Sequence, residues 1–179
     1  MSALLESLGR EAEGLRELYL LEAPDPHAVP EGIEVAGPLF VCLLAWDAED
    51  ASPDTIEILA RRLLAAGCVY ICCWGSGCST VHDVFDLVSI ERSAEAPVVM
   101  STWHEREPLG DAIWFALFAA DPDGSFSQRC GSVLGISIAS PEYAREIRVA
   151  MAVSTALRIR VVPALSAAER QNAAPFWAA

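Results

Sequence analysis

The chain has 179 residues, 53% of them hydrophobic, a size and composition that fit one folded domain and exclude a disordered chain. Its 25 acidic and 12 basic residues give a net charge of -13, which argues against a phosphate-backbone partner and against an anionic membrane surface. All the basic residues are arginines, so chemistry that requires a lysine, such as Schiff-base formation or a P-loop, is excluded.

The N-terminal segment, residues 3–21, carries leucines at a spacing that predicts an amphipathic helix, and a proline-rich connector follows up to residue 35. Acidic residues interrupt this segment, which is atypical of a signal peptide, and no apolar run approaches the roughly 20 residues of a membrane span. The six cysteines lie mostly within apolar runs, as buried thiols do. We therefore expect a cytoplasmic protein with reduced cysteines.

Strand and helix patterns alternate from residue 36 onward. Four apolar runs have the length of buried strands: 38–46, 68–74, 97–103 and 132–139. Amphipathic helix patterns follow these runs, at 53–66, 79–88, 108–119 and from 140 to the mid-150s. A fifth strand is expected at 157–162 and a helical tail at 164–179.

Strands that are apolar on both faces and alternate with helices are typical of βαβ units in a parallel sheet. We expect a three-layer α/β fold, with a mostly parallel sheet of about four or five strands and helices on both faces. This topology is Rossmann-like, although no nucleotide-binding motif is present. The chain forms a single domain: an N-terminal helix and connector (1–35), an α/β core (36–163) and a helical tail (164–179).

Three of the expected strands end in a tryptophan, at Trp46, Trp74 and Trp103. Because the carboxyl ends of parallel strands meet at one edge of a sheet, where open α/β folds bind ligands, these side chains would rim one site. Asp47 and Ser76 follow the first two tryptophans and add polar groups. The five residues are candidates for ligand binding; the alternative, that the tryptophans only close the edge of the sheet, stays open.

Cys78 and two histidines are the candidates for catalysis. Cys78 lies at the expected start of a helix, where the pKa of a thiol is lowered, and His82 is four residues further along the same side. His104 follows the third strand and would approach from the neighbouring strand end. A thiol nucleophile with a histidine base is typical of hydrolases and acyl-transfer enzymes.

The same residues allow other interpretations. Cys73 with Cys78, His82 and His104 would supply zinc ligands, but their spacing matches no zinc motif. Asp47 would suit a magnesium-dependent phosphoryl site, although no phosphate-binding loop accompanies it. In the plainest interpretation, the histidine at the helix is solvated and the cysteines pack in the core. We expect no bound metal and no cofactor.

Two segments resemble a group of small uncharacterised bacterial proteins. They are W-G-x-x-C-x-x-x-H-D, at residues 74–83, and T-W-H, at residues 102–104. The resemblance covers roughly residues 37–140 and therefore leaves out both ends of the chain. It implies a bacterial origin, and it brings no known activity with it.

The negative charge is uneven along the chain. Residues 1–139 hold 22 acidic residues and 7 arginines, whereas residues 140–179 hold 3 acidic residues and 5 arginines. This asymmetry favours a binding or regulatory module that acts through a protein partner with a basic surface, since opposite charges speed and orient the encounter. An immunity-like or inhibitory role in a bacterial defence operon is one concrete form. The alternative is an enzyme that uses Cys78 with His82 or His104.

Overall fold

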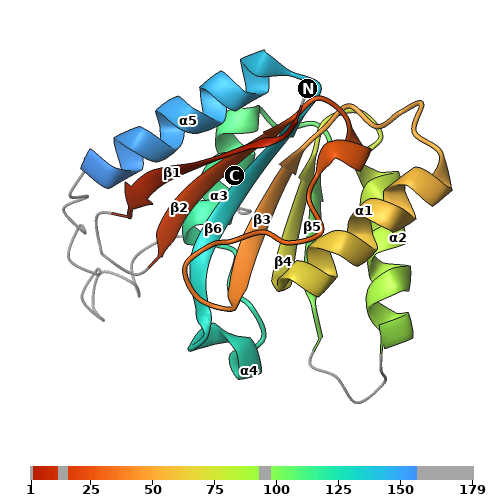
Figure 1. Cartoon of the computed structure of the whole chain (residues 1–179), viewed down its shortest axis with the longest axis horizontal. Helices are drawn as coiled ribbons and strands as arrows, with labels where there is room; N and C mark the ends of the chain where they lie inside the picture. Colours follow the sequence, from red (N-terminus) through yellow and green to blue (C-terminus); the bar gives the residue numbers. More distant parts are fainter. Residues whose placement is uncertain (1, 12–15, 93–97, 157–179) are drawn as a thin grey trace, which may run out of the picture.

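A six-stranded sheet in the order β1-β2-β6-β3-β4-β5 forms the centre of the protein, as the computed structural model shows (Figure 1). The structure describes residues 2–11, 16–92 and 98–156. The strands are β1 (Leu4–Arg10), β2 (Glu17–Ala23), β3 (Leu39–Ala45), β4 (Cys68–Trp74), β5 (Met100–His104) and β6 (Cys130–Ile138). All neighbouring pairs are parallel except β1 and β2, which form an antiparallel hairpin at one edge.

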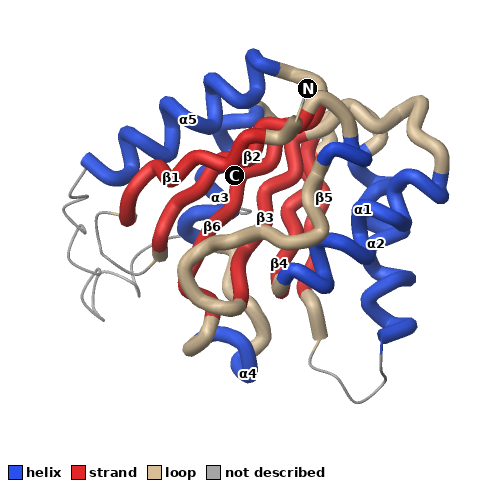
Figure 2. Tube along the Cα trace, viewed as in Figure 1, coloured by secondary structure: helices blue, strands red, loops and turns tan. Residues whose placement is uncertain are grey.

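Helices cover both faces of the sheet (Figure 2). The helical elements are η1 (Pro26–Ala28), α1 (Pro53–Ala66), α2 (Cys78–Arg92), α3 (Leu109–Phe118), α4 (Gly124–Ser127) and α5 (Pro141–Ala156). Helices α1 and α2 lie on one face, and α3 and α5 lie on the other. The fold is therefore α/β with a mostly parallel sheet, as the alternating sequence pattern predicts.

Strand β3 shows why both faces must be covered. Leu44 packs into a core shared with α1 and α2, whereas its neighbour Leu43 packs into a second core shared with α3 and α5. Both side chains are buried, because alternate residues of a strand point to opposite faces of the sheet. The continuous apolar run in the sequence is the direct result of this two-sided burial.

Local capping signals set the ends of α1. The Ser52 side chain accepts a hydrogen bond from the backbone N–H of Thr55 at 3.2 Å, and Pro53 occupies the first helical position. At the other end, Gly67 adopts a left-handed conformation with φ of +107°. Both boundaries agree with the positions that the sequence predicts.

The predicted N-terminal helix over residues 3–21 is wrong, because this segment forms the β1–β2 hairpin. Leu18 and Leu20, on either side of Tyr19, also fit the two-residue period of a strand, and both leucines are fully buried. The leucine spacing fits both a helix and a strand, and pairing with β6, more than 100 residues further along the chain, selects the strand. The hairpin also explains why the sheet has six strands rather than four or five.

The expected strand at 157–162 and the expected tail at 164–179 lie outside the described residues. Within the described ranges, no helix has the length and apolar content needed to cross a membrane. The structure also contains a short α4 turn and the η1 turn, which the sequence patterns did not indicate.

Candidate functional site

The chain reverses its winding direction between β3 and β6, which are neighbours in the sheet. Strand β3 leads to α1 on one face, and β6 leads to α5 on the opposite face. Such a switch point at the carboxyl ends of the strands is where open α/β folds place their ligand sites. Asp47, just after β3, and Tyr143, in the first turn of α5, meet there.

Asp47 connects three elements at this switch point. Its Oδ1 atom accepts hydrogen bonds from the backbone N–H of Ser76 at 3.0 Å and from the Ser76 hydroxyl at 3.1 Å. Its Oδ2 atom accepts a hydrogen bond from the Tyr143 hydroxyl at 2.7 Å. One carboxylate therefore ties the end of β3 to the β4–α2 loop and to the start of α5.

These hydrogen bonds change the ionisation of both partners. Partial burial of Asp47 acts to raise its pKa, but the hydrogen bonds from Ser76 and Tyr143 outweigh this effect and lower the pKa below its ordinary value. The hydrogen bond to Asp47, assisted by burial, raises the pKa of Tyr143 to about 12. Asp47 is therefore an ionised acceptor at neutral pH, and the Tyr143 hydroxyl stays protonated as its donor.

Trp46 and Trp74 support the same site. The backbone N–H of Trp46, whose side chain is buried, donates to the Trp74 carbonyl at 2.9 Å. The Trp74 ring meets the Tyr143 ring edge-on at 5.0 Å, and its indole N–H donates to the Glu107 carbonyl at 2.8 Å. The structure thus brings together Trp46, Asp47, Trp74 and Ser76, four of the five residues expected to bind a ligand.

Trp103 lies apart from these four residues. Its side chain faces α2, where the ring packs against the His82 ring at 4.6 Å. Tyr143, which is the donor to Asp47, is not among the residues that the sequence predicts for the site. The Ser140-Pro141-Glu142 helix start was the available signal, because a residue in the first turn after β6 must lie at the carboxyl edge of the sheet.

The Gly75-Ser76-Gly77 loop makes a tight turn against the end of β3. Gly75 has φ of +114°, and a Cβ atom there would lie only 2.4 Å from the carbonyl oxygen of Trp46. The Ser76 N–H is already occupied by the Asp47 carboxylate. These contacts favour a structural turn over a loop that cradles an anion.

The Cys78 thiol is hydrogen-bonded to the backbone of His104, but the contacts of the described residues join neither the His82 ring nor the His104 ring to it. Cys78 is only 1% exposed, and burial is the main cause that raises the pKa of its thiol, despite its position at the start of α2. His82 instead pairs with Asp83 at 3.1 Å and approaches Asp86 at 3.6 Å. The helix-start effect expected from the sequence is therefore smaller than the effect of burial.

His104 forms a chain of polar contacts at the end of β5. Its Nδ1 atom lies 2.8 Å from a Glu107 carboxylate oxygen, and its Nε2 atom lies 3.1 Å from the Thr102 hydroxyl. Hydroxyl, imidazole and carboxylate follow in the order of a catalytic triad. The Thr102 hydroxyl is also hydrogen-bonded to Tyr70 and Cys72, and His104 is 5% exposed, so the chain of contacts chiefly fixes the β5–α3 connection.

We predict slow alkylation of Cys78 in the folded protein. Burial and a raised pKa both reduce the thiolate that reacts with iodoacetamide near pH 7. The rate, followed by mass spectrometry of the Cys78 peptide, should be at least about 100-fold lower than in urea-unfolded protein. Glutathione serves as the reference thiol, and alkylation of Cys78 at or above its rate would contradict the prediction.

No group of three or more histidine, cysteine, aspartate or glutamate residues within the described ranges is placed to hold a metal ion. The zinc hypothesis for Cys73, Cys78, His82 and His104 and the magnesium hypothesis for Asp47 therefore gain no support from the structure.

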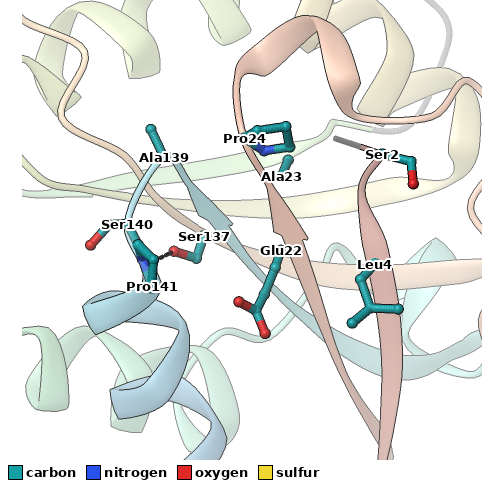
Figure 3. Close-up of a pocket in the computed structure, with 9 residues that line it drawn as sticks. All are labelled: Ser2, Leu4, Glu22, Ala23, Pro24, Ser137, Ala139, Ser140 and Pro141. Atoms are coloured by element: carbon teal, nitrogen blue, oxygen red, sulfur yellow. Dashed lines mark hydrogen bonds between the residues drawn. The ribbon is translucent and has the colours of Figure 1, made fainter.

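A cavity of about 400 Å³ lies at the carboxyl ends of β2 and β6, beside the start of α5 (Figure 3). Three of its polar lining residues, Glu22, Ser137 and Ser140, already have partners within the protein. Glu22 binds Arg148, the Ser137 hydroxyl donates to the Ser140 carbonyl, and the Ser140 hydroxyl accepts from the Tyr143 N–H. The cavity has the size of a small-ligand pocket, but it presents mainly apolar walls.

A second feature, the α2–β5 surface, lies at the edge of the sheet formed by β5. Large apolar side chains are exposed on α2, on β5 and just before β5: Leu87 (64%), Ile90 (72%), Val98 (63%), Met100 (40%) and Trp103 (53%). Contacts join the two elements, because the Ser101 hydroxyl donates to Asp86 and the His82 ring packs on Trp103. We define these five apolar residues as the α2–β5 surface.

Carboxylates flank the α2–β5 surface. Asp83 and the partly buried Asp86 lie on α2, and Glu105 and Glu107 lie in the loop after β5; Asp83, Glu105 and Glu107 are exposed. Arg106 is the basic residue of that loop. The surface therefore combines an apolar centre with a mostly negative rim, which is the usual anatomy of a protein interface.

A family model described as a domain of unknown function (DUF7684) matches residues 18–154. The matched range begins in β2 and ends in α5, so it contains both the Asp47 site and the α2–β5 surface. Comparisons with curated proteins and with solved structures gave no match.

Proposed function

The chain belongs to the DUF7684 family, whose function is unknown, and we propose that it is a binding module for a protein partner with a basic surface. The partner docks on the α2–β5 surface, and the α/β core holds this surface rigid. In this proposal the protein regulates its partner by occupying it and carries out no chemistry itself. A cytoplasmic inhibitor or immunity protein in a bacterial defence system is the concrete form that we favour.

The observation that carries the proposal is the concentration of exposed apolar side chains on α2 and β5. Five of the eleven large hydrophobic residues that are exposed in the described ranges belong to the α2–β5 surface. Scattered exposed apolar residues are ordinary, whereas a group of them rimmed by polar residues marks an interaction site. Trp103 is the natural anchor, because tryptophans contribute disproportionately to binding energy at interfaces.

The charge of the rim determines the kind of partner. Asp83, Asp86, Glu105 and Glu107 would attract a cationic surface and repel an anionic one. A second copy of this chain would bring the same carboxylates against each other, which disfavours a homodimer through this surface. The net charge of -13 adds a long-range field of the same sign, which accelerates association with a basic protein.

A Cys78-dependent hydrolase is the alternative proposal. It has less support than partner binding, because the Cys78 thiol is buried and its pKa is raised. In addition, the His82 ring pairs with Asp83 and the His104 ring pairs with Glu107, rather than with the thiol. The five apolar side chains of the α2–β5 surface, by contrast, are exposed to solvent.

The experiment compares capture of proteins from cells of the source bacterium by two double variants. Leu87→Arg with Ile90→Arg places two cations on the surface, and retention of the partner should fall at least about tenfold. Val149→Arg with Val153→Arg is the matched control, because these residues are similarly exposed on the outer side of α5. The control should retain the partner within about twofold of the wild type.

Salt provides a second criterion. Retention by the wild type should weaken from about 50 mM to about 300 mM salt, since exposed charges are screened at higher ionic strength. The proposal fails if the wild type retains no protein beyond what the α2 double variant retains, or if both double variants lose the partner equally.

A further inference from the structure

β5 is one of the two edge strands of the sheet, and in the part of the chain that the structure describes it has neither a bulge nor an acidic or arginine side chain. It pairs with β4 over all five residues from Met100 to His104 in regular register, without a bulge. It contains no aspartate, glutamate, lysine, arginine or proline. Edge strands without bulges or charges are templates for pairing with another chain.

The opposite edge, β1, is protected in two ways. Its register with β2 shifts between Ser7 and Gly9, which interrupts the ladder. Charged residues also stand on it: Glu6 is bound to Arg148, and Arg10 is bound to Glu17. Within the described residues the two edges therefore differ, because β1 has a register shift and charged side chains and β5 has neither.

The side chains beside β5 define what an added strand must carry. On the α2 side, an added strand would lie next to Trp103 and within reach of the Asp83 and Asp86 carboxylates. On the α3 side it would lie next to Met100, which is 40% exposed. Large apolar residues and arginine or lysine residues in alternation satisfy both sides.

We propose that the partner supplies an extended segment of alternating basic and large apolar residues, which pairs with β5 as a seventh strand. This inference rests on the proposed function and states its binding mode. Backbone hydrogen bonds to β5 give the affinity, and the flanking side chains select the basic segment.

The test uses a synthetic seven-residue peptide of alternating arginine and valine, with fluorescein attached, and its anisotropy at low salt. A second peptide of the same sequence has N-methyl groups on alternate residues along its pairing edge, which removes the backbone donors but keeps the charge. The unmodified peptide should bind at least about tenfold more tightly than the N-methylated peptide, because only the unmodified peptide has the backbone donors needed to pair with β5. Equal binding, or no binding at millimolar peptide, overturns the inference.

Hydrogen exchange and one pair of variants locate the binding. Amides of Met100–His104 should exchange more slowly with the unmodified peptide, whereas those of β1 should not change. Met100→Lys should reduce the affinity for the unmodified peptide at least about fivefold. Leu4→Lys, on the opposite edge strand β1, should have little effect on this affinity. If the Leu87→Arg, Ile90→Arg variant loses the cellular partner but the two peptides bind with equal affinity, strand addition is wrong while the proposed function is still supported.

Discussion

Replacement of Gly75 by alanine is expected to destabilise the protein by about 3 kcal/mol or more. Gly75 has φ of +114°, and the new Cβ atom would lie 2.4 Å from the oxygen and 2.8 Å from the carbon of the Trp46 carbonyl. Both of these atoms belong to the backbone at the end of β3, so no side-chain rotation relieves the contact. Urea unfolding followed by circular dichroism measures the change in the free energy of unfolding.

Gly32→Ala is the matched control for this substitution. Nothing lies within 4 Å of a Cβ atom at Gly32, and its φ lies outside the left-handed region. Its free energy of unfolding should stay within about 0.5 kcal/mol of the wild type. A Gly75→Ala protein that is as stable as this control would show that the β4–α2 loop does not lie against Trp46. The contact between Ser76, in the same loop, and Asp47 would then be wrong as well.

Asp47→Ala is expected to cost about 2 kcal/mol of stability at neutral pH. The substitution leaves the Ser76 N–H and the Tyr143 hydroxyl without their shared acceptor, and it removes the link between β3, the β4–α2 loop and α5. The cost is moderate because Asp47 is exposed, so water replaces part of the lost interaction. The same unfolding measurement tests it, and an effect below about 0.5 kcal/mol would contradict the structural role of this carboxylate.

The contribution of Asp47 should also depend on pH in a defined direction. Its pKa is lower in the folded than in the unfolded protein, so the folded state binds fewer protons, and the contribution is complete above the unfolded value of about 3.9. As the pH falls through the folded pKa, the contribution is lost. The stability difference between wild type and Asp47→Asn should therefore shrink below about pH 4. Tyr143→Phe should weaken this pH dependence, because it removes one of the hydrogen bonds that lower the pKa.

The middle of the chain was predictable because its signals are local. The apolar run at 68–74 coincides with β4, and Ser52 and Gly67 set the two ends of α1. The N-terminal hairpin was not predictable in this way. Leucines such as Leu18 suit a helix or a strand, and only the distant partner β6 selects the strand.

The candidate site was predictable to the extent that it follows from the direction of the strands. Asp47 and Ser76 meet because they follow two neighbouring parallel strands. Tyr143 was missed because it belongs to a helix, although the strand before that helix ends at the same edge. The α2–β5 surface depends on β5 being an edge strand, and strand order is a property of the assembled sheet that no local pattern reveals.

Hydrogen exchange of this protein, free and bound to the partner it captures, shows whether a basic partner occupies the α2–β5 surface. On binding we expect slower exchange in Met100–His104 and in α2, with unchanged exchange in α5 and β1. Protection confined to α5 or β1, with β5 and α2 exchanging as in the free protein, would contradict it.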